Sequence, residues 1–222
     1  RRAEMIIVND GGYDNGVSII RKKMEECTLI KLIDRKINRG KGFSIREGLR
    51  AAKGDFIVYT DADLPYLTAP IKDMLNRLKR DEADLILANR ELSPGGAQKK
   101  PHLLRQITHI VYSRFVRTLI PIPFSDTLAG LKAMNRKTVQ MILPQLTINR
   151  FSFDVELILI AQKAGCRIQE IPVSLKNVGK SNLSIRRDAP EMIREVVKIC
   201  LQNRKGLYEP QNKRSTAVVH SG

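Results

Sequence analysis

The chain alternates short apolar runs with stretches whose apolar residues recur at helical spacing. Short runs rich in Val, Ile and Leu predict buried strands, whereas apolar residues at i, i+3 and i+4 predict helices. The expected strands cover residues 5–8, 29–33, 55–60, 83–88, 128–134 and 166–175. The expected helices cover residues 17–26, 43–53, 69–80, 103–119, 136–142 and 153–164, and a last helix begins at 188. This alternation predicts an α/β fold with a mostly parallel sheet and helices on both faces.

The last predicted helix, 188–208, is both amphipathic and basic. Asp188 with Glu191 three residues later is typical of a capping box at a helix start. The apolar stripe of this helix either packs on the core or lies at an anionic membrane surface, where basic residues sit at headgroup level. Both can hold together, with the apolar face packed inward and only the basic rim meeting lipid. Residues 209–222 are expected to form a polar tail. The basic residues in and around the helix are Arg186, Arg187, Arg194, Lys198, Arg204 and Lys205.

Composition narrows the class of partner. With 222 residues one domain is expected, and a formal net charge of +16 calls for a polyanionic neighbour such as nucleic acid, an anionic membrane or a phosphorylated ligand. Three widely spaced cysteines without a Cys-x-x-Cys motif argue against a zinc site or a disulfide framework. No apolar run reaches membrane-spanning length, and no signal peptide is expected. The chain opens without Met, so we expect a fragment.

Polar residues follow three of the predicted strands. Asp61 and Asp63 come directly after the apolar run "FIVY", and the other two strands lead into Asn9-Asp10 and Asn89-Arg90. Two neighbouring carboxylates repel each other unless a cation lies between them. The alternative is a solvated turn whose acids cap the next helix. In α/β sheets ligands bind at the carboxyl ends of the strands, so the pattern, beside two glycine loops, predicts a site for a metal and phosphates.

Four segments, in this order, resemble family 2 glycosyltransferases of GT-A fold. They are "EMIIVNDGGYDNG", "NRGKGFSIREGLRAAKGDFIVYTDADL", "FSDTLAGLKAMNR" and "FSFDVELILIAQKAGCRIQEIPVSL". The resemblance covers about residues 4–208 and is nearest to the branch that moves a sugar onto polyprenyl phosphate, which includes dolichol-phosphate mannose and glucose synthases. It implies a GT-A Rossmann-like domain over residues 1–208, with the last helix as part of it.

The chain departs from the family pattern at several positions. The opening strand of the family, which ends in Pro-x-Tyr-Asn-Glu, is missing, and its loss is expected to expose two pairing edges in the sheet. Asn9 replaces the first Asp of the turn after the next strand, and Gly12 replaces its Ser. Pro65 stands where some relatives carry a metal-binding Gln, and Leu131 replaces a Phe.

The resemblance implies roles for the residues of the nucleotide side. Asp61 and Asp63 would hold Mg²⁺ or Mn²⁺, which neutralises charge on the departing diphosphate, and Asp63 is counted among the catalytic residues. Asp10 would accept a hydrogen bond from the base, with a structural capping role as the alternative. Lys41 lies in a glycine loop before a helix start and would contact phosphate, with a solvated lysine as the alternative.

Three further residues complete the predicted site. Arg90 follows a strand and suits phosphate oxygens, unless it forms only a surface ion pair. Arg105 lies near the start of a long helix, where relatives place a basic phosphate ligand. Asp126 would orient the acceptor or act as a base, or it is a structural turn acid. Asp154 and Glu156 open a helix, where acids are favoured by the helix dipole alone.

The function implied by the resemblance is inverting transfer of a hexose from UDP-glucose or GDP-mannose to a polyprenyl or dolichyl phosphate. Because the acceptor phosphate is already an anion, positioning and charge neutralisation would supply most of the rate. The expected location is the cytoplasmic face of the endoplasmic reticulum or plasma membrane, peripherally or through segments absent from this chain. The alternatives are a saccharide or protein acceptor, or a silent basic binding module. No nucleic acid partner is expected, because no strand carries interleaved aromatic and basic residues.

Overall fold

The computed structural model describes residues 3–12, 14–63, 66, 68–92, 103–174 and 185–209; of these, the side chains of 103–109 and 185–187 are not described. The strands are β1 Met5–Asp10, β2 Ile30–Arg35, β3 Phe56–Tyr59, β4 Leu85–Asn89, β5 Lys132–Asn135 and β6 Ile168–Pro172. The helices are α1 Gly16–Glu26, α2 Lys41–Ala51, α3 Thr68–Lys79, α4 Leu103–Leu119, α5 Arg136–Ile142, α6 Phe153–Lys163 and α7 Ile185–Arg204, with a short 3₁₀ turn at Leu143–Gln145.

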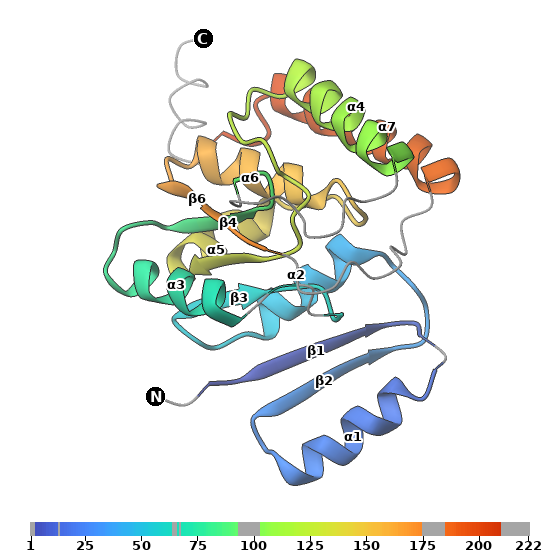
Figure 1. The fold of residues 1–222 in the computed structure, drawn as a ribbon, viewed down its shortest axis with the longest axis vertical. Helices are drawn as coiled ribbons and strands as arrows, with labels where there is room; N and C mark the ends of the chain where they lie inside the picture. The colour runs from blue at the N-terminus through green and yellow to red at the C-terminus, as the bar shows by residue number, and fades with distance from the viewer. Residues whose placement is uncertain are drawn as a thin grey trace, which may run out of the picture.

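The strands form two separate ladders (Figure 1). β1 and β2 pair in parallel, and the larger sheet has the order β3-β5-β4-β6. The predicted α/β class is confirmed, but the sheet is less parallel than the pattern predicts, because β5 runs antiparallel to both of its neighbours. This reversal aligns the first residue of β5, Lys132, with Tyr59 at the end of β3 and with Leu87 near the end of β4. A lysine is thereby placed at the carboxyl edge of the sheet.

Alternate residues of β4 point to opposite faces of the larger sheet, and helices cover both faces. Leu85 and Leu87 belong to a core cluster built around α6, whereas Ile86 packs in a second cluster with Met74 and Leu78 of α3. All five residues of β4 are buried, as expected for a central strand with both faces covered. The prediction of helices on both faces is therefore confirmed.

The N-terminal unit β1–α1–β2 is much less buried than the rest. Among the described residues from 3 to 39 none is fully buried, and the unit contacts the larger body chiefly through α2, which packs against β1. Within the described residues, β1 and β2 share no ladder with the other four strands. That a further strand belongs between the two ladders remains a prediction.

Asp84, directly before β4, holds the start of this strand beside the start of β6. The backbone N–H and the Nε of Arg167 donate to Oδ2 of Asp84 (2.9 and 3.0 Å), and Asn135 donates to Oδ1 (3.0 Å). Hydrogen bonds from Arg167 lower the pKa of Asp84 to about 2. The carboxylate therefore stays ionised well below neutral pH.

The last helix differs from its prediction at both ends. α7 runs from Ile185 to Arg204, so the predicted bounds 188–208 are wrong, and Asp188 lies inside the first turn with 3% exposure instead of at the N-cap. The capping box is therefore wrong as well, because the helix begins before the acid. The predicted polar tail beyond 209 lies outside the described residues.

Helix α7 carries two apolar stripes. One stripe is buried against the core and consists of Met192, Val196, Ile199 and Cys200. The other faces outward and consists of Ile193, Val197 and Leu201, which are 48%, 41% and 51% exposed. Core packing therefore accounts for only part of the apolar pattern that the sequence shows in this helix.

Candidate active site at the carboxyl edge of the sheet

The acidic pair follows β3 directly. The Nζ of Lys41 lies 3.1 Å from Oδ1 of Asp61, whose side chain is 41% exposed. Asp63, two residues further, is exposed in a turn. The Asp61 carboxylate lies against the backbone of Gly130, because a Cβ built on that glycine would be 1.8 Å from Oδ2. The structure thus brings three predicted segments together at one edge of the sheet.

A buried lysine supports this edge from beneath. Lys132 is fully buried, and its ammonium donates to Oδ1 of Asp154 (2.8 Å) and to the carbonyl oxygens of Thr127 (3.2 Å) and Ala129 (2.7 Å). Three acceptors match the three donors of an ammonium group. The hydroxyl of Tyr59 also donates to Asp154 (2.7 Å), and burial raises the pKa of this phenol, so it remains a donor.

Opposite charges balance within this cluster. Burial by itself would raise the pKa of Asp154, but Lys132 and Lys41 outweigh burial and hold that pKa below its ordinary value. Lys41, 3.5 Å from Asp154, has its pKa raised, because the attraction of Asp154 and Asp61 exceeds the effect of burial. Two carboxylates thus face two ammonium groups. A divalent cation would add two positive charges, which a bound diphosphate is suited to balance.

Arg90 and Asp126 form a bidentate ion pair. The guanidinium donates to both carboxylate oxygens (2.7 and 2.6 Å), and the backbone N–H of Arg90 donates to Oδ2 (3.0 Å). Asp126 is fully buried, whereas the Arg90 side chain is 28% exposed. Burial acts to lower the pKa of Arg90, but Asp126 raises it above its ordinary value. The geometry agrees with the two structural alternatives, an ion pair and a turn acid; the phosphate-binding and catalytic roles stay predictions.

Further contacts fix the loop that carries Asp126. The buried amide of Asn89 donates to Ser125 Oγ (2.8 Å) and to Glu170 Oε1 (2.9 Å), and burial raises the pKa of Glu170. The hydroxyl of Tyr66 accepts from the backbone N–H of Gly130 (3.0 Å), and burial raises the pKa of this tyrosine to about 12. The backbone on both sides of the ion pair is therefore held in place.

Asp10 fixes the glycine loop that precedes Lys41. Its carboxylate accepts from the backbone N–H groups of Arg39 and Gly40 and from the guanidinium of Arg35, each at 2.8 Å. Gly40 has φ +99°, a conformation that favours glycine. The structure thus shows a structural role of the kind that the sequence left open for Asp10, and a contact with the base stays a prediction.

The remaining predicted residues divide into two cases. Arg105 lies in the first part of α4, where only the backbone is described, so its role as a phosphate ligand stays a prediction. Glu156 is fully buried and accepts hydrogen bonds from Thr147 and Tyr208 (both 2.7 Å to Oε1), far from solvent. This acid therefore serves the fold.

The acidic pair fits a hard divalent cation. Among the described residues no group of three or more His, Cys, Asp or Glu side chains is arranged to hold a metal. Mg²⁺ nevertheless requires only one or two protein carboxylates, because water and substrate phosphates complete its shell. Asp61 and Asp63 offer such oxygens at an open edge, and the neighbour of Asp61 is an amine that a cation can displace.

Sequence reasoning missed Tyr59, Tyr66 and Lys132 at this site. A lysine inside the otherwise apolar strand segment "LKAM" was the available signal, since a buried lysine requires an acidic partner. The two tyrosines carry no such signal, because aromatic residues are common in buried strands and next to them.

An α/β domain with these features at its sheet edge defines the class of GT-A glycosyltransferase folds. The chain belongs to glycosyl transferase family 2, whose family model matches residues 1–142, and the family predicted from the four segments is thereby confirmed. It is 27% identical over 212 residues to a dolichyl-phosphate beta-glucosyltransferase of Dictyostelium discoideum, covering 93% of this chain and 65% of that protein. The corresponding Saccharomyces cerevisiae protein is 25% identical over 228 residues, covering 96% and 68%. The chain thus spans about two thirds of the length of these relatives.

Solved structures agree on the fold. Glucosyl-3-phosphoglycerate synthase from Mycobacterium tuberculosis, in complex with Mn²⁺, UDP-glucose and phosphoglyceric acid, matches with a TM-score of 0.63 at 16% identity, covering 93% of this chain and 69% of that one. The same enzyme with Mg²⁺ and UDP matches with a TM-score of 0.59 at 16% identity, covering 90% and 68%. At this level of identity the likeness establishes the fold alone.

Proposed function

We propose that this domain transfers glucose from UDP-glucose to a dolichyl or related polyprenyl phosphate, with inversion and with Mg²⁺ or Mn²⁺ as cofactor. The observation that carries the proposal is the half-exposed carboxylate of Asp61 beside Lys41 at the sheet edge, because this pair of charges supports binding of a metal and a diphosphate. The choice of sugar and acceptor rests on the relatives that match almost the whole chain, which are named dolichyl-phosphate beta-glucosyltransferases.

On the donor side, Asp61 and Asp63 bind the metal and Lys41 contacts the diphosphate. The metal, when bound, supplies Lewis-acid neutralisation of the charge that develops on the leaving group. Lys41 is held between two carboxylates, so it can follow the diphosphate only by giving up part of its contact with Asp61. Lys132 keeps Asp154 neutralised during this exchange, since it remains buried beneath the site.

On the acceptor side, Arg90 binds the incoming phosphate, with Arg105 as a second cation from α4. Asp126 acts as a positioning residue, because its bidentate contact fixes the guanidinium plane. A phosphate monoester needs no strong base, since its oxygen is already anionic. In a single displacement this oxygen attacks the anomeric carbon while the nucleoside diphosphate departs, which inverts the configuration.

Thermal unfolding with candidate ligands tests the donor assignment. UDP-glucose with Mn²⁺ is expected to raise the unfolding temperature of the wild type and of Asp73→Asn, an exposed acid on α3 that serves as the matched control. Asp61→Asn and Asp63→Asn are expected to fold and to lose this shift. Transfer of labelled glucose to dolichyl phosphate is then measured for all four proteins.

Each part of the proposal has its own contrary outcome. Metal-dependent turnover at the wild-type rate in both Asp61→Asn and Asp63→Asn would show that these acids do not hold the metal. Stabilisation and transfer with GDP-mannose but not with UDP-glucose would overturn the choice of sugar and leave the metal site intact.

A further inference from the structure

An apolar surface on α4 and α7 is not explained by the transfer site. Large apolar side chains that are 41–61% exposed gather on these two helices and the turn after α7, and they define the α4–α7 face: Ile110, Val111, Ile193, Val197, Leu201 and Leu207. The two helices lie side by side at one end of the molecule (Figure 1). Six such residues in one region exceed the scattered apolar residues that are normal on a surface.

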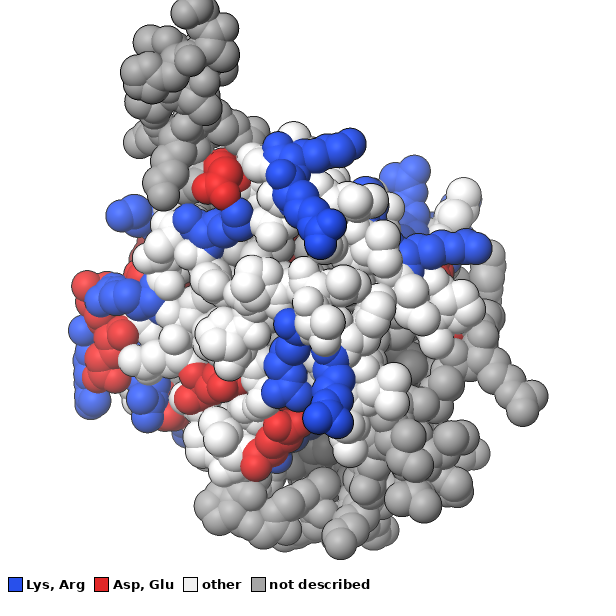
Figure 2. Space-filling view, turned by 90° about the horizontal axis from the view of Figure 1, so that it is seen from above, with Lys and Arg blue, Asp and Glu red and all other residues white. Residues whose placement is uncertain are grey.

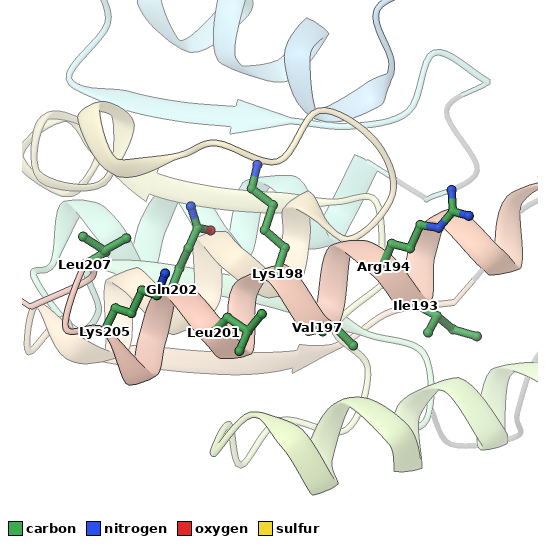
Figure 3. Close-up of a pocket in the computed structure, with 8 residues that line it drawn as sticks. All are labelled: Ile193, Arg194, Val197, Lys198, Leu201, Gln202, Lys205 and Leu207. Atoms are coloured by element: carbon green, nitrogen blue, oxygen red, sulfur yellow. The ribbon is translucent and has the colours of Figure 1, made fainter.

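A shallow groove follows the outer side of α7. It has a volume of about 550 Å³ and is lined by apolar and basic residues of the helix and of the turn after it. In Figure 3 the side chains of Ile193, Val197 and Leu201 point toward the side where α4 lies, whereas Lys198 points to the other side. The apolar stripe and the basic residues thus occupy two adjoining sides of the same helix.

The exposed charged residues of α7 on this surface are mostly basic. From residue 191 to 204 the exposed positions of α7 are either apolar or basic, namely Ile193, Arg194, Val197, Lys198, Leu201 and Arg204. Of the two acids of this stretch, the side chain of Glu191 is 45% exposed and pairs with Arg150, whereas Glu195 is partly buried and accepts from the backbone of Arg150 and Ser152. On α4, Arg114 and Arg117 are exposed as well. Figure 2, which views this end from above, shows a broad uncharged area bordered by Lys and Arg side chains and, in places, by Asp and Glu side chains.

We propose that the α4–α7 face docks on the interface of an anionic lipid membrane. An outward apolar stripe flanked by cations matches acyl chains beneath anionic headgroups. A second copy of the chain is a poorer occupant, because it would bring basic border against basic border. No helix within the described ranges has the length and apolar character needed to cross a bilayer, so this docking is a surface contact. The inference goes beyond the transfer reaction, since attachment and catalysis can each hold without the other.

Vesicle flotation tests the docking without using enzyme activity. The whole 222-residue chain is mixed with phosphatidylcholine vesicles or with vesicles containing phosphatidylserine, both without polyprenyl phosphate. The wild type is expected to bind the anionic vesicles preferentially and to dissociate as salt is raised. Arg194→Gln/Lys198→Gln is expected to lower the partition coefficient about 25-fold, from roughly fivefold for each cation. Lys72→Gln/Lys79→Gln on α3 removes the same charge elsewhere and serves as the control.

A second variant tests the contribution of the apolar residues of the α4–α7 face to vesicle binding. Val197→Ser/Leu201→Ser is expected to weaken binding about tenfold even at high salt, where electrostatic attraction is screened. Ile19→Ser, an exposed apolar position on α1, is expected to bind as the wild type does.

Equal binding of the wild type to neutral and anionic vesicles, or equal losses in the α3 control and the α7 variant, would overturn the proposal. So would concentration-dependent dimerisation abolished by Val197→Ser/Leu201→Ser without any vesicle binding. Transfer to a short-chain, water-soluble polyprenyl phosphate is assayed in parallel. Wild-type rates there, with lost flotation, would separate the membrane docking from the proposed transferase function.

Discussion

Replacing Gly130 by alanine should displace the carboxylate of Asp61, the proposed metal ligand, without unfolding the domain. The new Cβ would lie 1.8 Å from Oδ2 and 2.5 Å from Cγ of Asp61, whereas real Cβ contacts are not shorter than 3.0 Å. The oxygen must therefore move by at least 3.0 − 1.8 = 1.2 Å. Because the Asp61 side chain is 41% exposed, it can move outward into water, which breaks its 3.1 Å contact with Lys41.

The structural cost of this movement is small. A partly exposed ion pair contributes about 0–1 kcal/mol, and replacing glycine by alanine reduces the entropy of the unfolded chain by a similar free energy. The hydrogen bond from the backbone N–H of residue 130 to Tyr66 uses no side-chain atom of that residue, so it can persist. We therefore expect the free energy of unfolding to change by no more than about 1 kcal/mol.

Metal binding should respond much more strongly. A displaced ligand or its support typically lowers metal affinity about 10- to 100-fold. Isothermal titration of Mn²⁺ with UDP measures this loss, and urea unfolding checks stability. Gly48→Ala is the control, since a Cβ there meets nothing closer than 3.6 Å. Wild-type Mn²⁺–UDP affinity in Gly130→Ala would refute the placement of Asp61 as a ligand.

Three further predictions concern charged residues, two at the site and one at the opposite edge of the sheet. Lys41→Met should strengthen Mn²⁺ binding in the absence of nucleotide, because Asp61 loses its competing ammonium group, and it should weaken UDP binding. Electron paramagnetic resonance titration checks both, and unchanged affinities would contradict the contact of Lys41 with Asp61 and with the diphosphate. Lys132→Met should lower the free energy of unfolding in urea by about 3–5 kcal/mol, because Asp154 loses its buried ammonium partner and keeps only Tyr59 and the more distant Lys41. Adding Asp154→Asn should recover part of that loss, and full stability of the single variant would argue against the buried pair. Asp84, with its pKa lowered to about 2, stabilises the fold above the ordinary carboxyl pKa and loses this effect as the pH falls through 2. The wild type should therefore be more stable than Asp84→Asn by about 1 kcal/mol near neutral pH, and this difference should shrink between pH 4 and 2. A difference that grows in this range would contradict the assignment.

The sequence predicts the strands and the edge of the site well, because both depend on local patterns. The run before Asp61 is a strand, and two of the predicted positions are linked through the glycine loop, because Asp10 accepts from Gly40 and the next residue, Lys41, pairs with Asp61. The pairing of Arg90 with Asp126 was not predicted, although both residues were selected. Their contact depends on a loop 36 residues further along the chain, and no local pattern fixes that distance.

The antiparallel direction of β5 could not be predicted from the sequence. Its apolar pattern is the same whichever direction the strand runs, so periodicity predicts the strand and says nothing of its orientation. The orientation in turn decides that Lys132 lies beneath Asp154. The start of α7 was misplaced for a different reason: acids are favourable throughout the first turn of a helix, so Asp188 marks the region of the start but not the first residue.

The shallow burial of β1, α1 and β2 has a consequence for local stability. A unit without fully buried side chains gains little from desolvation, so its opening free energy should lie well below that of the α6 core, and its backbone amides should exchange with deuterium first. Asp10 belongs to this unit and holds the loop that leads into Lys41. Each opening therefore releases one wall of the proposed donor site while the buried Lys132–Asp154 pair stays folded. Sugar-nucleotide affinity would then follow the closed fraction of the N-terminal unit, and ligand binding should slow its exchange more than that of any other part of the domain.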